Sequence, residues 1–332
     1  MTIPMKRKGF IDLHTHGFGK YDTRTNDPDD ILGIAELHGK AGTAAILPAI
    51  YSGTIDKMRK NIEAVRRAME VQKAKGKRQK AKGKNFTLSL TLPPRGGGQG
   101  WGGVSSLITE PALSLSKGHS ALILGVHLEG PFLNPARSGA LDKDAFLKPT
   151  LASLERLIHG FEEIIRIITI APELPGALKV IEFCAGAGIR VNMGHSDATY
   201  GEAVDGKKAG ATGVTHIFNA MRPFHHREPG LAGFGLLDED TFIEVIADGV
   251  HLHTETLRLI FRTKRHDRII LVSDSVEGAM PGGKPVYRAK GVLAGSGMSL
   301  ADAAGVLKNL GISRDAAAAA GLENPKKYLS GQ

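Results

Sequence analysis

The chain has 332 residues, of which 42% are hydrophobic, and it carries a formal net charge of +9. This length fits one large domain, such as an α/β barrel of ~250 residues with insertions. The single cysteine, Cys184, excludes an intrachain disulfide and favours a reducing, cytoplasmic setting. No apolar run approaches the ~20 residues of a membrane span, and the first residues lack the apolar stretch of a signal peptide.

Short segments that are apolar throughout recur along the chain, and helical patterns that end in glycine lie between them. Strands of a parallel sheet covered by helices have this pattern, because both of their faces are buried. Eight such strands predict a closed (β/α)8 barrel of the TIM type, with residues 1–332 forming a single domain. The predicted strands are 9–14, 43–50, 122–129, 165–173, 188–195, 213–218, 242–249 and 268–274, and the clearest helices are 31–42, 174–188 and 200–210.

Residues 73–120 interrupt this alternation. They begin with a lysine run that ends at Lys84, and continue rich in Gly, Ser and Pro with no apolar period. A loop of this length is typical of a functional or disordered segment, and we expect a mobile insertion between the second and third strands. The lysines could attract nucleic acid, but without interleaved aromatic residues or a reader motif a solvated loop is favoured. We therefore expect neither a nucleic-acid nor a membrane partner.

Two histidines, His14 and His16, stand at the end of the first predicted strand. Alternate residues of a strand point to the same side, so both imidazoles can face one metal ion. Two polar residues in a strand-ending turn are the alternative interpretation. Glu129 ends the third predicted strand ahead of Gly-Pro, where barrels carry catalytic groups; an ordinary loop glutamate is the alternative.

His195, His216 and Asp274 close the fifth, sixth and eighth predicted strands. Imidazole is a common ligand of zinc and iron, although either histidine alone could be a satisfied core residue. Asp274 could be a metal ligand, a general base or a helix N-cap. The carboxyl ends of all barrel strands converge on one face, so the joint pattern predicts a metal-dependent hydrolase. The metal would activate water and polarise a carbonyl, and Asp274 would pass a proton to the leaving group.

Several segments together resemble the N-acetylglucosamine-6-phosphate deacetylases of the amidohydrolase superfamily. The resemblance covers about residues 9–328 apart from the insertion, and HLEGPF and THIFNAM are its most specific parts. It implies hydrolysis of the N-acetyl group of N-acetylglucosamine 6-phosphate to glucosamine 6-phosphate and acetate, a step of amino-sugar catabolism. The other segments are IDLHTHG, APE, GHSDA, REPG, IADGVHLH and LVSDS.

The resemblance also implies roles for the residues at the strand ends. One or two zinc or iron ions per subunit are expected, with Glu129 as the bridge between two ions. The main metal ligands would be Glu129, His195 and His216. The second metal position, which only some members keep, would be formed by His14 and His16. The catalytic acid/base would be Asp274.

Further positions match substrate contacts of the family. Arg227 resembles an arginine that reaches the neighbouring subunit's site, which implies a homodimer, and its planar guanidinium suits a phosphate; a surface arginine is the alternative. Asn219 would approach the phosphate, and His251 resembles a sugar-contacting histidine. The predicted substrate-binding residues are Ala140, Leu141, Asn219, Ala220, Arg227, Asp248, Gly249, Val250, His251, Leu293, Ala294 and Gly295.

The sequence departs from the family pattern in three places. The β-structure that usually precedes the first barrel strand and follows the last helix is expected to be largely missing, leaving apolar surface exposed. Leu141, in SGALD, stands where the family carries a histidine in a KGAH-like stretch. Two alternatives therefore remain, namely another amidohydrolase acting on a cyclic or linear amide, and an inactive truncated barrel.

Overall fold

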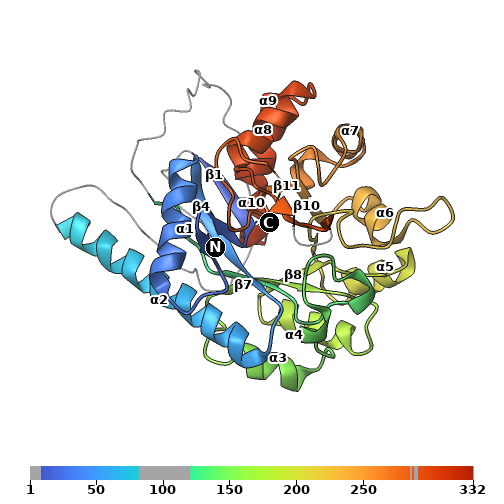
Figure 1. Cartoon of the computed structure of the whole chain (residues 1–332). Helices are drawn as coiled ribbons and strands as arrows, with labels where there is room; N and C mark the ends of the chain where they lie inside the picture. The colour runs from blue at the N-terminus through green and yellow to red at the C-terminus, as the bar shows by residue number, and fades with distance from the viewer. Residues whose placement is uncertain (1–8, 82–119, 285, 288–290, 332) are drawn as a thin grey trace, which may run out of the picture.

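The computed structural model describes residues 9–81, 120–284, 286–287 and 291–331 (Figure 1). Its main sheet is parallel, with neighbouring strands in the order β1-β4-β6-β7-β8-β9-β10-β11. This confirms the predicted (β/α)8 barrel and the approximate position of every predicted strand. The strands are β1 (Phe10–Thr15), β4 (Thr43–Tyr51), β6 (Val126–Glu129), β7 (Ile165–Ile170), β8 (Arg190–Met193), β9 (Gly213–Val214), β10 (Phe242–Ile246) and β11 (Ile269–Val272), and the short β5 (Leu122–Ile123) pairs with β4.

The barrel closes between β1 and β11 without a regular ladder. A bridge joins Thr15 to Ser275, and the backbone N–H of Asp274 donates to His14 O over 2.9 Å. The buried Asp12 carboxylate accepts from the backbone N–H of Ser273 at 3.1 Å and of His14 at 3.3 Å. Burial raises the pKa of Asp12 to about 7 although these hydrogen bonds oppose the shift. A side chain thus replaces part of the strand pairing at the seam, where His14 and Asp274 lie side by side.

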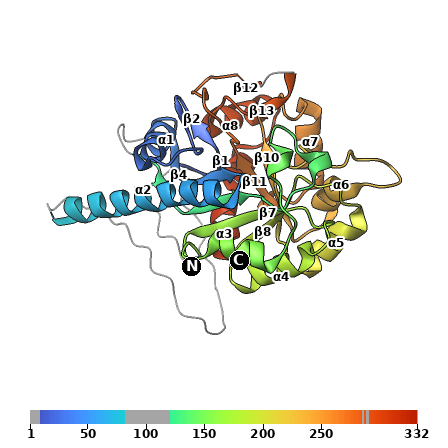
Figure 2. The same ribbon diagram turned by 60° about the horizontal axis from the view of Figure 1, so that its bottom comes forward.

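Helices surround the barrel (Figures 1 and 2). As predicted, three of them are followed by a glycine with positive φ, namely Gly42 (98°), Gly188 (81°) and Gly210 (116°). The helices are α1 (Pro28–Lys40), α2 (Ile55–Ala81), α3 (Leu151–Ile158), α4 (Ala177–Gly186), α5 (Tyr200–Lys208), α6 (Gly230–Leu237), α7 (Thr254–Thr263), α8 (Leu300–Asn309), α9 (Arg314–Ala318) and α10 (Asn324–Ser330).

Helix α2 extends into the segment that was predicted to be a loop. It continues to Ala81, and its far end projects from the barrel in Figure 1. Lys73 and Lys75 are exposed there, so no apolar period marks this part of the helix, whereas its Lys, Ala and Gln residues favour helix formation. The rest of the predicted insertion, residues 82–119, lies outside the described residues.

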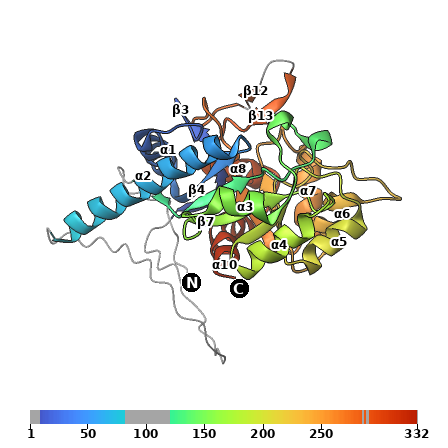
Figure 3. The ribbon, with the colours of Figure 1, turned by 90° about the horizontal axis from the view of Figure 1, so that it is seen from below.

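Two small antiparallel ribbons accompany the barrel in the described ranges. They are β2 (Gly17–Phe18) with β3 (Tyr21–Asp22), and β12 (Val286–Tyr287) with β13 (Leu293–Gly295). The view from below in Figure 3 places β12 and β13 at one end of the barrel and α10 at the other. No helix in the part of the chain that the structure describes is long and apolar enough to span a bilayer. That the flanking β-sandwich domain of the family, formed by the β-structure before the first barrel strand and after the last helix, is largely missing stays a prediction.

Candidate metal centre

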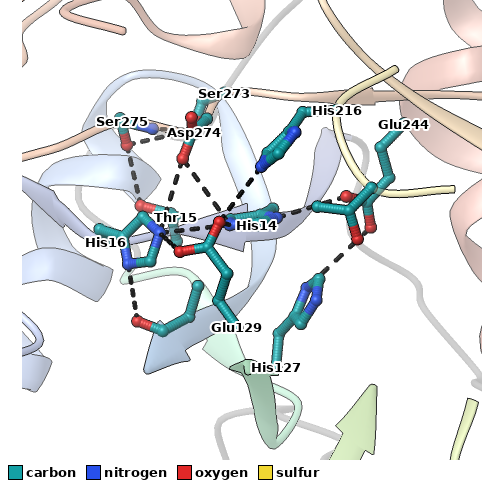
Figure 4. Close-up of polar contacts among 12 residues, drawn as sticks. His14, Thr15, His16, His127, Glu129, His216, Glu244, Ser273, Asp274 and Ser275 are labelled. Atoms are coloured by element: carbon teal, nitrogen blue, oxygen red, sulfur yellow. Dashed lines mark hydrogen bonds and ion pairs between the residues drawn. The ribbon is translucent and has the colours of Figure 1, made fainter. Parts of the chain in front are cut away.

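The carboxyl ends of the strands bring the predicted site residues together. His14 belongs to β1 and His16 follows it, Glu129 is the last residue of β6, and His195, His216 and Asp274 come after β8, β9 and β11. Figure 4 shows the Glu129 carboxylate pointing at His14, His16 and His216, with Asp274 above it. The site therefore follows from strand ends that converge at the barrel mouth.

Glu129 is the centre of this cluster. Its Oε1 lies 3.1 Å from His195 Nε2, 3.2 Å from His216 Nε2 and 3.5 Å from His14 Nε2, and its Oε2 lies 3.1 Å from His16 Nε2. Ligands held ~2.0–2.1 Å from a tetrahedral ion lie about 3.3 Å from one another, so this spacing fits a metal. Three groups are compact enough to hold an ion: Glu129 with His195 and His216, Glu129 with His14 and His16, and Glu244 with His14 and His127. The first two share Glu129.

The outer nitrogens of the histidines set the direction of the inner ones. His16 Nδ1 lies 3.0 Å from Ala49 O, and His195 Nδ1 lies 2.9 Å from Arg137 O. A carbonyl oxygen only accepts hydrogen bonds, so each Nδ1 donates, and in the neutral form that binds a metal each ring would turn its Nε2 lone pair toward the space beside the Glu129 carboxylate. Acceptors that face one another in a buried site need positive charge between them, and a metal ion would supply it.

The charges of the site favour the same conclusion. Burial alone would raise the pKa of Glu129, but His16, His14 and His195 hold it well below its usual value. Burial alone would lower the pKa of His14, but hydrogen bonds to Glu129 and Glu244 raise it well above the ordinary value. The site thus keeps its carboxylate ionised and favours positive charge beside it.

The backbone turns sharply at these residues. Among the described non-glycine residues, positive φ is confined to His195 (47°), His216 (27°), Phe218 (73°), Ala220 (50°) and Asp274 (46°). Such conformations cost about 1–3 kcal/mol each and persist where surrounding contacts hold them. Three of the five carry predicted chemistry, so the strain is concentrated where the chain turns side chains into the barrel mouth.

A cavity of about 340 Å³ opens above Glu129 and Asp274. Asp248 lies behind its lining, where its Oδ2 is 2.7 Å from His251 Nδ1. Burial alone would lower the pKa of His251, but Asp248 raises it. Gly249, Val250 and Arg227 are not among the lining residues. Of the predicted substrate-binding residues, the lining contains Ala140, Leu141, Asn219, Ala220, His251, Leu293, Ala294 and Gly295.

Sequence reasoning missed Tyr51, which also lines the cavity. Its ring stacks on His16 with centroids 3.7 Å apart, and its buried hydroxyl has no hydrogen-bond partner among the described residues. Tyr51 ends β4, so the strand-end argument applied to His14 and Glu129 could have found it. Glu244 was missed as well, although a carboxylate within the apolar segment FIEVI is itself a signal.

The chain is similar to known proteins in sequence and in structure. No family model matches the chain. It is 29% identical over 88% of its length to an N-acetylgalactosamine-6-phosphate deacetylase of Escherichia coli O157:H7, and covers 69% of that protein. It is 29% identical over 83% of its length to an N-acetylglucosamine-6-phosphate deacetylase of Lysinibacillus sphaericus, and covers 60% of that protein. The chain therefore spans about two thirds of these relatives.

The fold is similar to that of a solved N-acetyl-D-glucosamine-6-phosphate deacetylase mutant from Mycobacterium smegmatis, in complex with N-acetyl-D-glucosamine-6-phosphate. The TM-score is 0.76 at 25% identity, and the match covers 97% of this chain and 77% of the other. A structure from Thermotoga maritima matches with the same TM-score at 24% identity. The likeness therefore extends over nearly the whole described barrel.

Proposed function

The chain is a homologue of the N-acetylglucosamine-6-phosphate deacetylases, and we propose that it hydrolyses N-acetylglucosamine 6-phosphate to glucosamine 6-phosphate and acetate. The observation that carries the proposal is the Glu129-centred cluster beneath a cavity of about 340 Å³. The cluster offers metal ligands, and the cavity leaves room for a ligand beside them. A cytoplasmic location is part of the proposal, because the substrate is phosphorylated and Cys184 is a free thiol.

We assign the main ion to Glu129, His195 and His216, and a second ion to His14 and His16 with Glu129 shared. The metal, zinc or iron, supplies an activated water and a polarised acetyl carbonyl when bound. Asp274 Oδ1 lies 3.7 Å from His14 Nε2 and 3.6 Å from His16 Nε2, so it faces the same space. Asp274 takes the proton of the attacking water and delivers it to the nitrogen as the amide C–N bond breaks.

The described lining of the cavity contains no lysine or arginine, yet the proposed substrate carries a phosphate. Arg227 is exposed and lies in the loop that leads into α6. This loop projects from the barrel in Figure 2. We propose that Arg227 binds the phosphate in the neighbouring subunit of a homodimer, with Asn219 beside it. His251, held by Asp248, would donate to a sugar hydroxyl.

The test of the proposal is acetate release by the purified chain from N-acetylglucosamine 6-phosphate, with added zinc or iron. N-acetylgalactosamine 6-phosphate belongs in the same assay, because the E. coli relative is named for that substrate. N-acetylglucosamine without phosphate is the control, and it should react poorly. No acetate from either phosphate with any metal would overturn the proposal and favour the alternative of an inactive barrel.

Leu141→His is expected to raise kcat/KM. Leu141 lines the cavity but cannot donate a hydrogen bond, and one restored contact worth ~1.5–3 kcal/mol corresponds to a gain of about 10- to 100-fold. Steady-state kinetics measure the change, and Leu141→Met is the control that keeps the volume without a donor. An unchanged or lower kcat/KM in the histidine variant would remove position 141 from the substrate site.

Arg227→Ala is expected to raise KM for the phosphorylated substrate about 10- to 100-fold with little change in kcat, because a charged hydrogen bond contributes ~1.5–3 kcal/mol. If Arg227 serves the neighbouring subunit, mixing this variant with Asp274→Asn rebuilds one complete site in each mixed dimer. At low substrate concentration the mixture should regain up to about a quarter of wild-type activity. Activity equal to the sum of the separate variants would contradict a shared site.

A further inference from the structure

A continuous string of buried hydrogen bonds runs from the candidate metal centre to the last helix. His14 Nδ1 lies 3.3 Å from Glu244 Oε2 on β10, and Asn192 Nδ2 on β8 donates to Glu244 Oε1 over 2.8 Å. The Tyr328 hydroxyl on α10 donates to Asn192 Oδ1. Figure 4 shows Glu244 on the side of His14 that faces away from Asp274. The string therefore connects the barrel mouth with its opposite end.

The donor and the acceptor of each hydrogen bond in this string can be assigned. The Glu244 carboxylate accepts with both oxygens, from Asn192 Nδ2 at Oε1 and from His14 Nδ1 at Oε2. Asn192 donates to Glu244 with its amide nitrogen and accepts from the Tyr328 hydroxyl with its amide oxygen. His14 must then donate with Nδ1, which leaves the Nε2 lone pair for the ion. All four side chains are at most 2% exposed, so water does not compete for these groups.

The packing around Asn192 and Tyr328 leaves no room for a side chain at Gly213. Gly213 on β9 lies between Asn192 and Tyr328, and a Cβ there would overlap Asn192 Oδ1 and lie 2.7 Å from the Tyr328 hydroxyl oxygen. Its φ is not in the left-handed region, so space rather than backbone conformation requires glycine. His127 Nδ1 also faces Glu244, 4.0 Å from its Oε1, but it hydrogen-bonds to Leu13 O over 3.0 Å and leaves Oε2 to His14.

We propose that Glu244, held by Asn192 and Tyr328, is a positioning residue that keeps the Nδ1 proton on His14 and thereby sets the affinity of the His14–His16 ion position. His16 and His195 use backbone carbonyls for the same purpose, so His14 alone depends on this string. The inference rests on the proposed metal site, and it is independent of which sugar phosphate is the substrate.

The test is zinc binding to the metal-stripped full chain, followed by calorimetry and elemental analysis. The wild type should bind two ions, and Glu244→Gln should bind the second one ~10- to 100-fold more weakly while the first is unchanged, as for other partners behind metal ligands. In this variant one amide oxygen faces two donors, so the Gln NH₂ group opposes either the Asn192 NH₂ group or the proton on His14 Nδ1. Adding Asn192→Asp restores an acceptor for both Gln and Tyr328, so the double variant should recover much of the lost affinity.

Gly213→Ala disturbs the same string without removing a polar group, and it should also weaken the second ion selectively. Gly305→Ala is the matched control, because nothing lies within 4 Å of a Cβ there. Unchanged affinity for the second ion in Glu244→Gln, or no recovery in the double variant, would overturn the inference. A wild type with one ion would overturn it too, and a wild type with none would overturn the proposed function as well.

Discussion

Glu129→Gln is expected to remove the bound metal and to lower kcat/KM by ~10³-fold or more, because several kcal/mol of transition-state stabilisation depend on the ion. Glu129 is the one residue common to the two groups to which we assign the ions. A neutral amide offers one oxygen in place of two charged ones. It therefore cannot bind both the ion held by His195 and His216 and the ion held by His14 and His16. No other single substitution should affect both ion positions so strongly.

Elemental analysis and thermal unfolding with and without zinc measure this effect. Zinc that binds only the folded chain raises the Tm of the wild type through linkage, and this rise should vanish in Glu129→Gln. Glu182→Gln, an exposed change on α4, controls for the loss of one carboxylate. Two zinc ions retained by Glu129→Gln would show that the cluster does not hold the metal.

The barrel could be predicted from sequence because its strands are buried on both faces and three of its helices are followed by glycine. The segment TAAILPAIY, for example, is buried at every position in β4, which is why it has no alternation. The ends of such strands converge in any barrel of this type. The convergence of His14, Glu129 and Asp274 therefore followed from the fold class and needed no side-chain information.

Other features depend on packing that sequence patterns do not encode. The positive φ of His195 and Asp274 is unfavourable for these residues on its own and is held by neighbouring strands. The interaction of Glu244 with His14 joins residues 230 positions apart, and the role of Gly213 appears only when Asn192 and Tyr328 are placed on either side of it. Residues 73–81 of α2 were predicted to belong to a loop because this exposed end of the helix has no apolar face.

Asp274→Asn is expected to lower kcat by ~10²–10⁴-fold, the usual contribution of a positioned proton-transfer group, and to leave both ions bound. Asp274 Oδ1 lies 3.6–3.7 Å from His16 and His14 Nε2 and belongs to none of the compact ion groups. KM should change little, because the substrate contacts proposed for the cavity are untouched. Steady-state kinetics and metal content of the same preparation separate these effects.

Asparagine also suits the backbone at this position. Asp274 has φ +46°, a region in which Asn is enriched relative to other non-glycine residues, so the variant should keep its fold and its Tm. Asp274→Leu, of similar volume but unsuited to this conformation, should lose stability as well as activity. Loss of an ion in Asp274→Asn would instead make Asp274 a metal ligand, the alternative that its place after a barrel strand leaves open.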